Sequence, residues 1–162
     1  MYQNEGLREI SKKYPNIDFS KIDGKVVVPV GAICEQLGLN VVFQNLKNGV
    51  AGYFDDKTKT IFINEKYSAT RNLFTIAHEI GHYILHTGLN YRFDEYHKYT
   101  PEERIREIQA NDFAGKLLMP ETQFIEVFKK YKDNFDKISD VFGVSSRACE
   151  VRAFNLGLID NI

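Results

Sequence analysis

The chain has 162 residues, a length that suits one compact domain or a domain with a small appendage. Hydrophobic residues make up 43% and charged residues 27%, which is the usage of a globular protein with a real core. Lysine and arginine number 21 against 22 aspartates and glutamates, and this balance argues against bulk nucleic acid or an anionic membrane surface as a partner. No apolar run approaches the roughly 20 residues that a membrane-spanning helix needs, and no secretory signal is predicted.

The two cysteines, Cys34 and Cys149, lie far apart in the sequence among apolar and small residues. This setting predicts two buried free thiols rather than a disulfide, and a reducing cytoplasm as the matching compartment.

The first half of the chain predicts short helices followed by strands. The expected helices and strands cover residues 7–14 and 29–37 and then 40–43, 50–54 and 60–64. The last two strands flank the polar, turn-like residues 55–58 and are therefore expected to form a hairpin. We therefore expect a small antiparallel sheet near the N-terminus.

The second half predicts helices. Ser68 is a good cap for a long helix over 69–86, and a loop rich in aromatic residues follows over 87–99. Thr100 with Pro101 and Glu103 opens a helix that runs to about residue 119. Two or three further helices complete the chain, with a break at Gly143. The predicted fold class is α+β.

The sequence His-Glu-Ile-Gly-His within the first long helix points to a metal site. His78 and His82 are four residues apart, so both imidazoles leave one face of the helix and can bind one ion. Glu79 lies on the adjoining face, where it is expected to act as a general base rather than as a ligand. The residues that flank these three are apolar, so we expect this helix to be buried. Buried polar side chains need hydrogen-bond partners or a metal ion, because burying them alone costs free energy.

A catalytic zinc ion usually takes three protein ligands. The position six residues after His82 is Gly88, which excludes the three-histidine spacing. His86 lies about 12 Å from His78 along the helix axis, so we expect it to contact the ligands rather than the ion.

An acidic residue of the next helix is the better third ligand. Glu107 falls within the apolar arc of that helix, beside the small residues Ala110 and Ala114 that would let the two helices approach closely. A half-exposed glutamate paired with a nearby arginine is the alternative, and Asp94 and Glu95 of the loop are the fallback ligands.

The chemistry that follows is peptide hydrolysis. The bound metal would lower the pKa of a water molecule to about 7 and polarise the scissile carbonyl, while Glu79 removes the water proton. Zn²⁺ is expected, and Mn²⁺ suits two nitrogens and a carboxylate as well. The donor that stabilises the oxyanion is left open among five residues: His86, His97, Tyr91, Tyr96 and Tyr99. A substrate peptide could add to the edge of the hairpin.

Three blocks in order resemble the ImmA/IrrE family of metallo-endopeptidases: IFIN at 61–64, RNLFTIAHEIGHYILH at 71–86 and EIQANDFAGKLLMP at 107–120. The resemblance covers about residues 29–120 and implies a gluzincin-like core, with His78, His82 and Glu107 as zinc ligands and Glu79 as the catalytic acid and base. We expect the zincin-like core to comprise residues 1–120. The resemblance also implies a regulatory protease that cleaves a helix-turn-helix repressor of a phage, mobile element or stress regulon.

The C-terminal residues 121–162 are expected to form a helical, helix-turn-helix-like extension that packs on this core. A DNA-binding regulator is therefore the rival interpretation. Its reading face would offer Arg147 and Arg152 with Glu150 among them, which gives little affinity for phosphates. A zinc-containing interaction protein without turnover is the third hypothesis.

Overall fold

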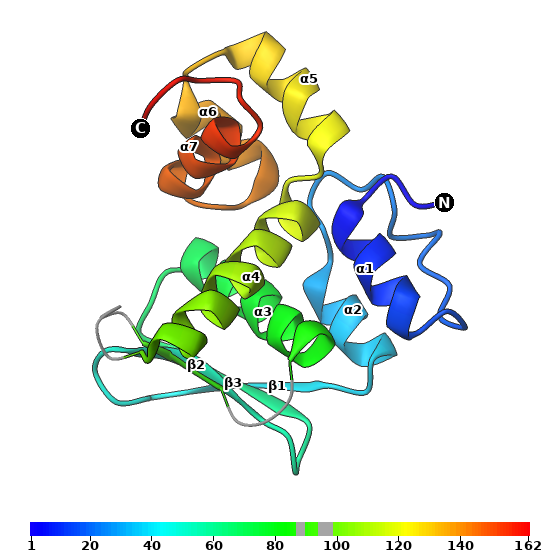
Figure 1. Ribbon diagram of the computed structural model, residues 1–162, viewed down its shortest axis with the longest axis vertical. Coiled ribbons are helices and arrows are strands. Elements are labelled where there is room, and N and C mark those ends of the chain that lie inside the picture. The colour runs from blue at the N-terminus through cyan, green and yellow to red at the C-terminus, as the bar shows by residue number, and fades with distance from the viewer. Residues whose placement is uncertain (87–89, 94–98) are drawn as a thin grey trace. The chain divides into compact units, whose positions relative to one another are not determined.

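The structure is a computed structural model that describes residues 1–86, 90–93 and 99–162, and of 90–93 only the backbone. The chain forms two compact units. The sheet unit comprises residues 29–114, and the helical unit comprises residues 1–28 and 115–162. Figure 1 shows the sheet with α3 and α4 above it. The fold class is α+β, as predicted.

The sheet unit contains three helices and a four-stranded sheet in its described part. Its elements are α2 (Val30–Gln36), β1 (Asn40–Gln44), β2 (Val50–Asp55), β3 (Thr60–Asn64), α3 (Ala69–Leu85), β4 (Asn90–Phe93) and α4 (Pro101–Leu118), whose last turn belongs to the helical unit. The three strands predicted before α3 and the two long helices are confirmed to within about one residue. β4 lies where a loop was expected.

The sheet is mixed rather than antiparallel, which corrects the prediction. Its strand order is β1-β3-β2-β4, so β3 lies between β1 and β2. The predicted hairpin of β2 and β3 is antiparallel, with Tyr53 opposite Phe62. β1 pairs with β3 in parallel, with Val41 opposite Ile61. Because both hairpin strands have a neighbour on each side, the hairpin itself offers no edge to a peptide, and that hypothesis is wrong.

One face of the sheet is covered by α3. Ile61 and Ile63 of β3 both point to this face, because side chains two residues apart on a strand lie on the same side of the sheet, and both are fully buried. The ring of Tyr83 on α3 packs edge-on against Phe54 of β2 at 5.4 Å. This packing fixes the long helix against a rigid support.

Local signals in the sequence fix where the two long helices begin. The hydroxyl of Ser68 accepts a hydrogen bond from the backbone N–H of Arg71, as predicted. At the start of α4, Thr100 Oγ1 accepts from the N–H of Glu103, and the Glu103 carboxylate accepts from the N–H of Thr100. This reciprocal pair confirms the predicted capping box. The predicted stop of α3 at Gly88 lies outside the described residues, and the helix ends at Leu85.

The helical unit combines α1 (Glu5–Lys13) with α5 (Glu121–Tyr131), α6 (Phe135–Phe142) and α7 (Ser146–Asn155). The break at Gly143 is confirmed, with the left-handed φ of 71° between α6 and α7. Arg152 of α7 is buried, donates to the carbonyl of Met119 at 2.9 Å and pairs with Glu5 of α1 at 2.7 Å. Residues 121–162 thus share a unit with the N-terminus. Their packing on the catalytic core stays a prediction.

Candidate metal centre

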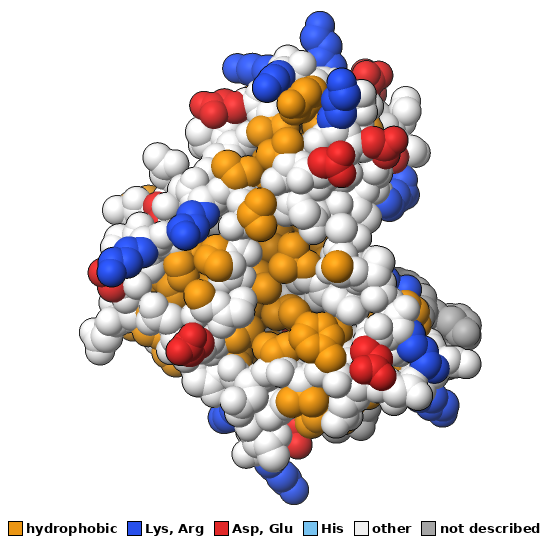
Figure 2. All heavy atoms as spheres, turned by 180° about the vertical axis from the view of Figure 1, so that it is seen from behind, with side chains coloured by type: hydrophobic (Ala, Val, Ile, Leu, Met, Phe, Trp, Pro, Cys, Tyr) orange, Lys and Arg blue, Asp and Glu red, His pale blue; other side chains and the backbone are white. Residues whose placement is uncertain are grey.

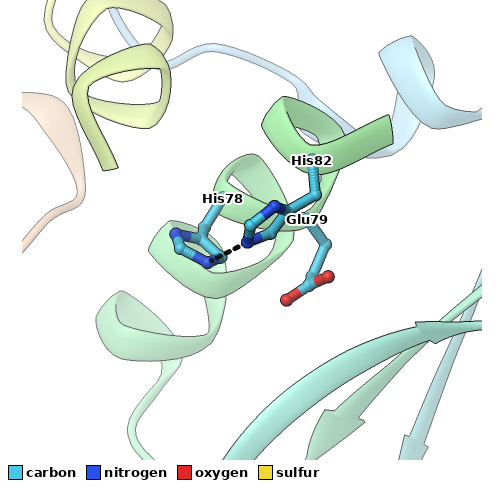
Figure 3. Close-up of side chains that lie close together, drawn as sticks. All are labelled: His78, Glu79 and His82. Carbon is cyan, nitrogen blue, oxygen red and sulfur yellow. Dashed lines mark hydrogen bonds between the residues drawn. The ribbon is translucent and has the colours of Figure 1, made fainter. Parts of the chain in front are cut away.

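Two buried histidines of α3 face one another. His78 is fully buried and His82 is 1% exposed, and their Nε2 atoms lie 3.0 Å apart. Figure 3 shows the two imidazole rings pointing toward one another from successive turns of the helix. The four-residue spacing brings both rings to one side, because an α-helix turns once in 3.6 residues.

Glu107 of α4 brings a carboxylate to the same point. Its Oε1 lies 3.1 Å from His78 Nε2, and its Oε2 contacts His82 Nε2. Glu107 is 5% exposed, as its place in the apolar arc of α4 predicts. The structure therefore brings together the three residues that the sequence predicts as ligands.

These three residues fit a metal ion. Ligand atoms at 2.0–2.1 Å from a tetrahedral ion lie about 3.3 Å from one another. The two separations measured from His78 Nε2, 3.0 Å to His82 and 3.1 Å to Glu107, are close to that value. Two imidazole nitrogens and one carboxylate are ligands that Zn²⁺ and Mn²⁺ both accept.

The surroundings of Glu107 favour its ionised form. Burial alone would raise the pKa of its carboxyl group, but the hydrogen bonds and charges of His78 and His82 outweigh burial and hold the pKa far below its usual range. The carboxylate is therefore ionised, which is the form that a metal ion requires of its ligands.

Glu79 lies beside the two histidines and is fully buried. One potential ligand atom from each of His78, Glu79 and His82 lies within 4.8 Å of the other two. Figure 3 shows the carboxylate of Glu79 extending from the same stretch of α3, next to the imidazoles of His78 and His82. A general base needs this placement, near the reacting water but on a different helical position from the ligands.

The structure describes only some of the residues predicted as oxyanion donors or fallback ligands. His86 Nδ1 lies 3.1 Å from His82 Nδ1, so His86 contacts a ligand. Burial lowers the pKa of His86, and this favours its neutral imidazole. Tyr99 is buried two residues before α4 begins. His97, Tyr96, Asp94 and Glu95 lie outside the described residues, and the side chain of Tyr91 is also not described.

Two side chains of α4 at this site were not predicted. Asn111 Oδ1 lies 2.8 Å from His78 Nδ1, and Gln109 Oε1 lies 2.7 Å from His86 Nε2. Asn111 follows Glu107 by one helical turn, which is a signal that the sequence does carry. Gln109 belongs to the polar side of α4 and reaches the site through its long side chain, so helical phase alone would not select it.

Two buried histidines one turn apart, a glutamate beside them and a carboxylate from a second helix define a metallopeptidase-like site on an α+β fold. The chain belongs to the Peptidase M78 family, whose model describes an IrrE N-terminal-like domain and matches residues 34–154. The matched segment contains every residue of the site described above. Membership of a metallopeptidase family agrees with the ImmA/IrrE resemblance.

One curated protein is similar to about half of the chain, and one solved structure is similar to most of it. The radiation response metalloprotease IrrE of Deinococcus radiodurans is 35% identical over 82 residues, which are 49% of this chain and 25% of that protein. A solved structure, a Mycobacterium tuberculosis transcriptional regulator, superposes with a TM-score of 0.61 at 17% identity. This likeness covers 94% of this chain and 46% of the other, and it shows the fold. The chain thus spans a quarter to a half of the length of these proteins.

Proposed function

We propose that the protein is a metal-dependent endopeptidase whose metal ion, Zn²⁺ or alternatively Mn²⁺, is held by His78, His82 and Glu107. The observation that carries the proposal is the convergence of His78 Nε2, His82 Nε2 and the Glu107 carboxylate in a buried site. An ion bound there supplies the Lewis acidity that activates water and polarises a peptide carbonyl.

The residues of the chain have separate tasks in this reaction. Glu79 accepts the proton of the attacking water and later passes it to the leaving amine, as a buried carboxylate beside the ligands can. His78, His82 and Glu107 fix the position at which the carbonyl is attacked. Their burial excludes bulk water, which strengthens every electrostatic interaction in the site.

The substrate we propose is a helix-turn-helix transcriptional repressor, cleaved in the cytoplasm. The resemblance to the ImmA/IrrE endopeptidases supports this substrate class, and the name of the Deinococcus relative supports proteolysis in a stress response. The two buried free thiols, Cys34 and Cys149, suit a reducing compartment. None of the described helices is both long and apolar enough to cross a membrane.

Direct DNA binding is less well supported by the structure. Arg152, one of two arginines on the proposed reading face, is 6% exposed and paired with Glu5 inside the helical unit. On the face drawn in Figure 2, acidic and basic side chains are interspersed around the C-terminal helices instead of forming a continuous basic surface. Specific duplex binding depends on such a surface.

Co-incubation with candidate repressors tests the proposal. The full chain, loaded with Zn²⁺ or with Mn²⁺, is mixed with purified small helix-turn-helix repressors encoded beside its gene, and the products are identified by mass spectrometry. We expect one defined cut in one repressor, prevented by a chelator. Cleavage that persists in the His82→Ala variant would contradict the assigned metal site. A metal-loaded protein that cuts none of the repressors, but cuts other proteins, would reject the substrate class alone.

A further inference from the structure

Strand β1 forms an edge of the sheet, because in the described part of the chain only β3 pairs with it. The N–H of Asn40 donates to the carbonyl of Lys59 at 2.9 Å, and the carbonyl of Gln44 accepts from the residue after β3 at 2.9 Å. The even-numbered residues of β1 thus bond to β3. Main-chain groups of successive strand residues point to opposite sides, so the N–H and C=O groups of Val41 and Phe43 point to the open side.

A groove of about 380 Å³ lies between this edge and the first half of α3. Phe43 is paired with Ile63 in the register of the sheet, so its side chain lies on the face that α3 covers. Phe43 is nevertheless 53% exposed, because it borders the groove. The volume falls in the range of about 300–1,000 Å³ that is usual for binding pockets. We call this hollow the β1 groove, and it is lined by Phe43, Tyr67, Ala69, Asn72, Leu73 and Ile76.

The β1 groove is separate from the metal centre. Leu73 and Ile76 line the groove, and they precede His78 by five and two residues. At about 100° per residue, these spacings place both side chains about 140–160° around α3 from His78. The groove therefore lies on the flank of α3 opposite to the imidazoles, and a molecule bound there leaves the metal centre open.

Asn72 gives the groove a polar group that lacks a partner. Asn72 is 8% exposed, and its Nδ2 donates to the carbonyl of Tyr67 at 3.2 Å, which leaves Oδ1 as the acceptor of the amide. This Oδ1 is buried and has no hydrogen-bond partner among the described residues. A buried acceptor without a donor is unfavourable, so a bound group that supplies an N–H would be stabilised there.

The end of the groove at which α3 begins favours negative charge. Ala69 lines the groove and is the first residue of α3, a 17-residue helix whose N-terminus carries a partial positive charge. The guanidinium of Arg71 lies 3.7 Å from the centre of the Tyr67 ring, which also lines the groove. Lys66 and Glu65, the two residues before Tyr67, are both exposed and offset one another in charge. The net charge at this end is thus positive.

We propose that the β1 groove binds an extended segment of a partner protein, which adds to β1 as a further strand of the sheet. The main chain of the segment pairs with Val41 and Phe43, an apolar side chain enters the groove, and an acidic side chain lies near the start of α3. From Ala69 to Ile76 the groove follows α3 for about 10 Å, the length of about three residues of a strand. A second copy of β1, with the sequence Asn-Val-Val-Phe-Gln, carries no acidic residue and fits this charge less well. The inference does not rest on the proposed function.

Fluorescently labelled octapeptides test this binding mode on the metal-free full chain, so the result is independent of peptidase activity. The peptides alternate valine with threonine and carry two glutamates at one end, in one version at the N-terminus and in the other at the C-terminus. We expect one version to bind, as measured by fluorescence anisotropy. Replacing its glutamates by lysines should weaken binding by about 5-fold or more. Equal binding of the lysine peptide, or no binding of either version, would overturn the proposal.

Methylation of the peptide backbone distinguishes strand addition from apolar contact alone. In an added strand, the N–H groups of alternate residues face β1. The bound peptide is therefore N-methylated in two complementary versions, one at the odd and one at the even positions. We expect one version to lose binding and the other to keep most of it. Equal loss or equal retention in the two versions would contradict pairing with β1.

Two variants of β1 locate the binding site. Phe43→Thr removes the aromatic side chain from the groove, whereas Val42→Thr changes the opposite face of the same strand, where Val42 is paired with Phe62. Threonine suits a strand at both positions. We expect Phe43→Thr to weaken peptide binding by about 10-fold or more and Val42→Thr by less than about 2-fold.

Equal effects of the two variants would place the peptide elsewhere and overturn the proposal. Sedimentation of the wild type tests the second copy as occupant. A wild-type dimer that Phe43→Thr dissociates would show that β1 pairs with itself, which would also overturn the proposal. If Phe43→Thr fails to fold, the two methylated peptides still decide the question on the wild type.

Discussion

Gly81 of α3 lies against the backbone of Ala110 and the ring of Phe113, both on α4. A Cβ at position 81 would lie 3.3 Å from Ala110 Cα and 3.0 Å from Phe113 Cδ1. Small residues at both positions thus set how closely α4 approaches α3. The approach matters for the site because Glu107 lies one turn before Ala110 on α4 and must reach His78 and His82.

Gly81→Ala is expected to destabilise the protein by about 1–3 kcal/mol, because the added methyl group overpacks the contact with Phe113. Metal affinity should fall with it as Glu107 is pushed away from the histidines. Gly115→Ala on α4 is the matched control. Apart from the adjacent residues and the helix's own backbone, no described atom lies within 4 Å of a Cβ there, and alanine should stabilise the helix by about 0.5–1 kcal/mol. Urea unfolding measures both, and a Gly81→Ala variant as stable as the wild type would refute the close packing.

Metal binding should raise the thermal stability of the wild type but not of Glu107→Ala. A ligand that binds only the folded state at 100 times its dissociation constant adds about 2.7 kcal/mol to the free energy of unfolding. Glu102→Ala, on the exposed first turn of the same helix, should respond to Zn²⁺ as the wild type does. Thermal unfolding with and without Zn²⁺ measures the difference. An equal rise in the Glu107→Ala melting temperature would remove Glu107 from the ligand set.

The site could be predicted largely because helical periodicity carries its geometry. The spacing of His78 and His82, and the phase of Glu107 relative to Ala110 and Ala114, follow from 3.6 residues per turn. The starts of the two long helices could be predicted equally well, because Ser68 and Thr100 each accept a hydrogen bond from the backbone N–H three residues further on.

What could not be predicted depends on contacts between distant segments. The parallel pairing of β1 with β3 results from the position of β3 between β1 and β2, which no local pattern encodes. The pair of Arg152 and Glu5 joins positions 147 residues apart, and Gln109 reaches His86 from the polar side of its helix. Such contacts are decided by tertiary packing.

Arg152→Ala should destabilise the helical unit by about 3–5 kcal/mol, because Glu5 loses its buried partner and the Met119 carbonyl loses its donor. Arg147 is the control on the same helix. Its pair with Glu150 is exposed, and Arg147→Ala should cost less than about 1 kcal/mol.

The same variant tests the rival function. If the protein bound duplex DNA, Arg147→Ala would lower its affinity for DNA, which an electrophoretic mobility assay on the wild type and this variant measures.

The two thiols should make the fold sensitive to alkaline pH. Burial raises the pKa of Cys34 to about 12, and burial with the charge of Glu150 raises that of Cys149 to about 12, from an ordinary value of 9.0. The folded state keeps both protons after the unfolded chain begins to lose them. Stability is thus unaffected well below pH 9 and falls between about pH 9 and pH 12. The Cys34→Ala, Cys149→Ala double variant should show a shallower decline in urea unfolding between pH 8 and pH 10. Identical slopes would argue against buried thiols.

The most direct test of the metallopeptidase assignment compares Glu79→Gln with the wild type after both have been loaded with Zn²⁺ and their metal content measured. Glutamine has nearly the same shape as glutamate but cannot accept the proton of water. The assignment predicts one metal ion per chain in both proteins and a cleavage rate lower by at least about 100-fold in the variant. A metal-loaded Glu79→Gln protein that cleaves its substrate at the wild-type rate would contradict it.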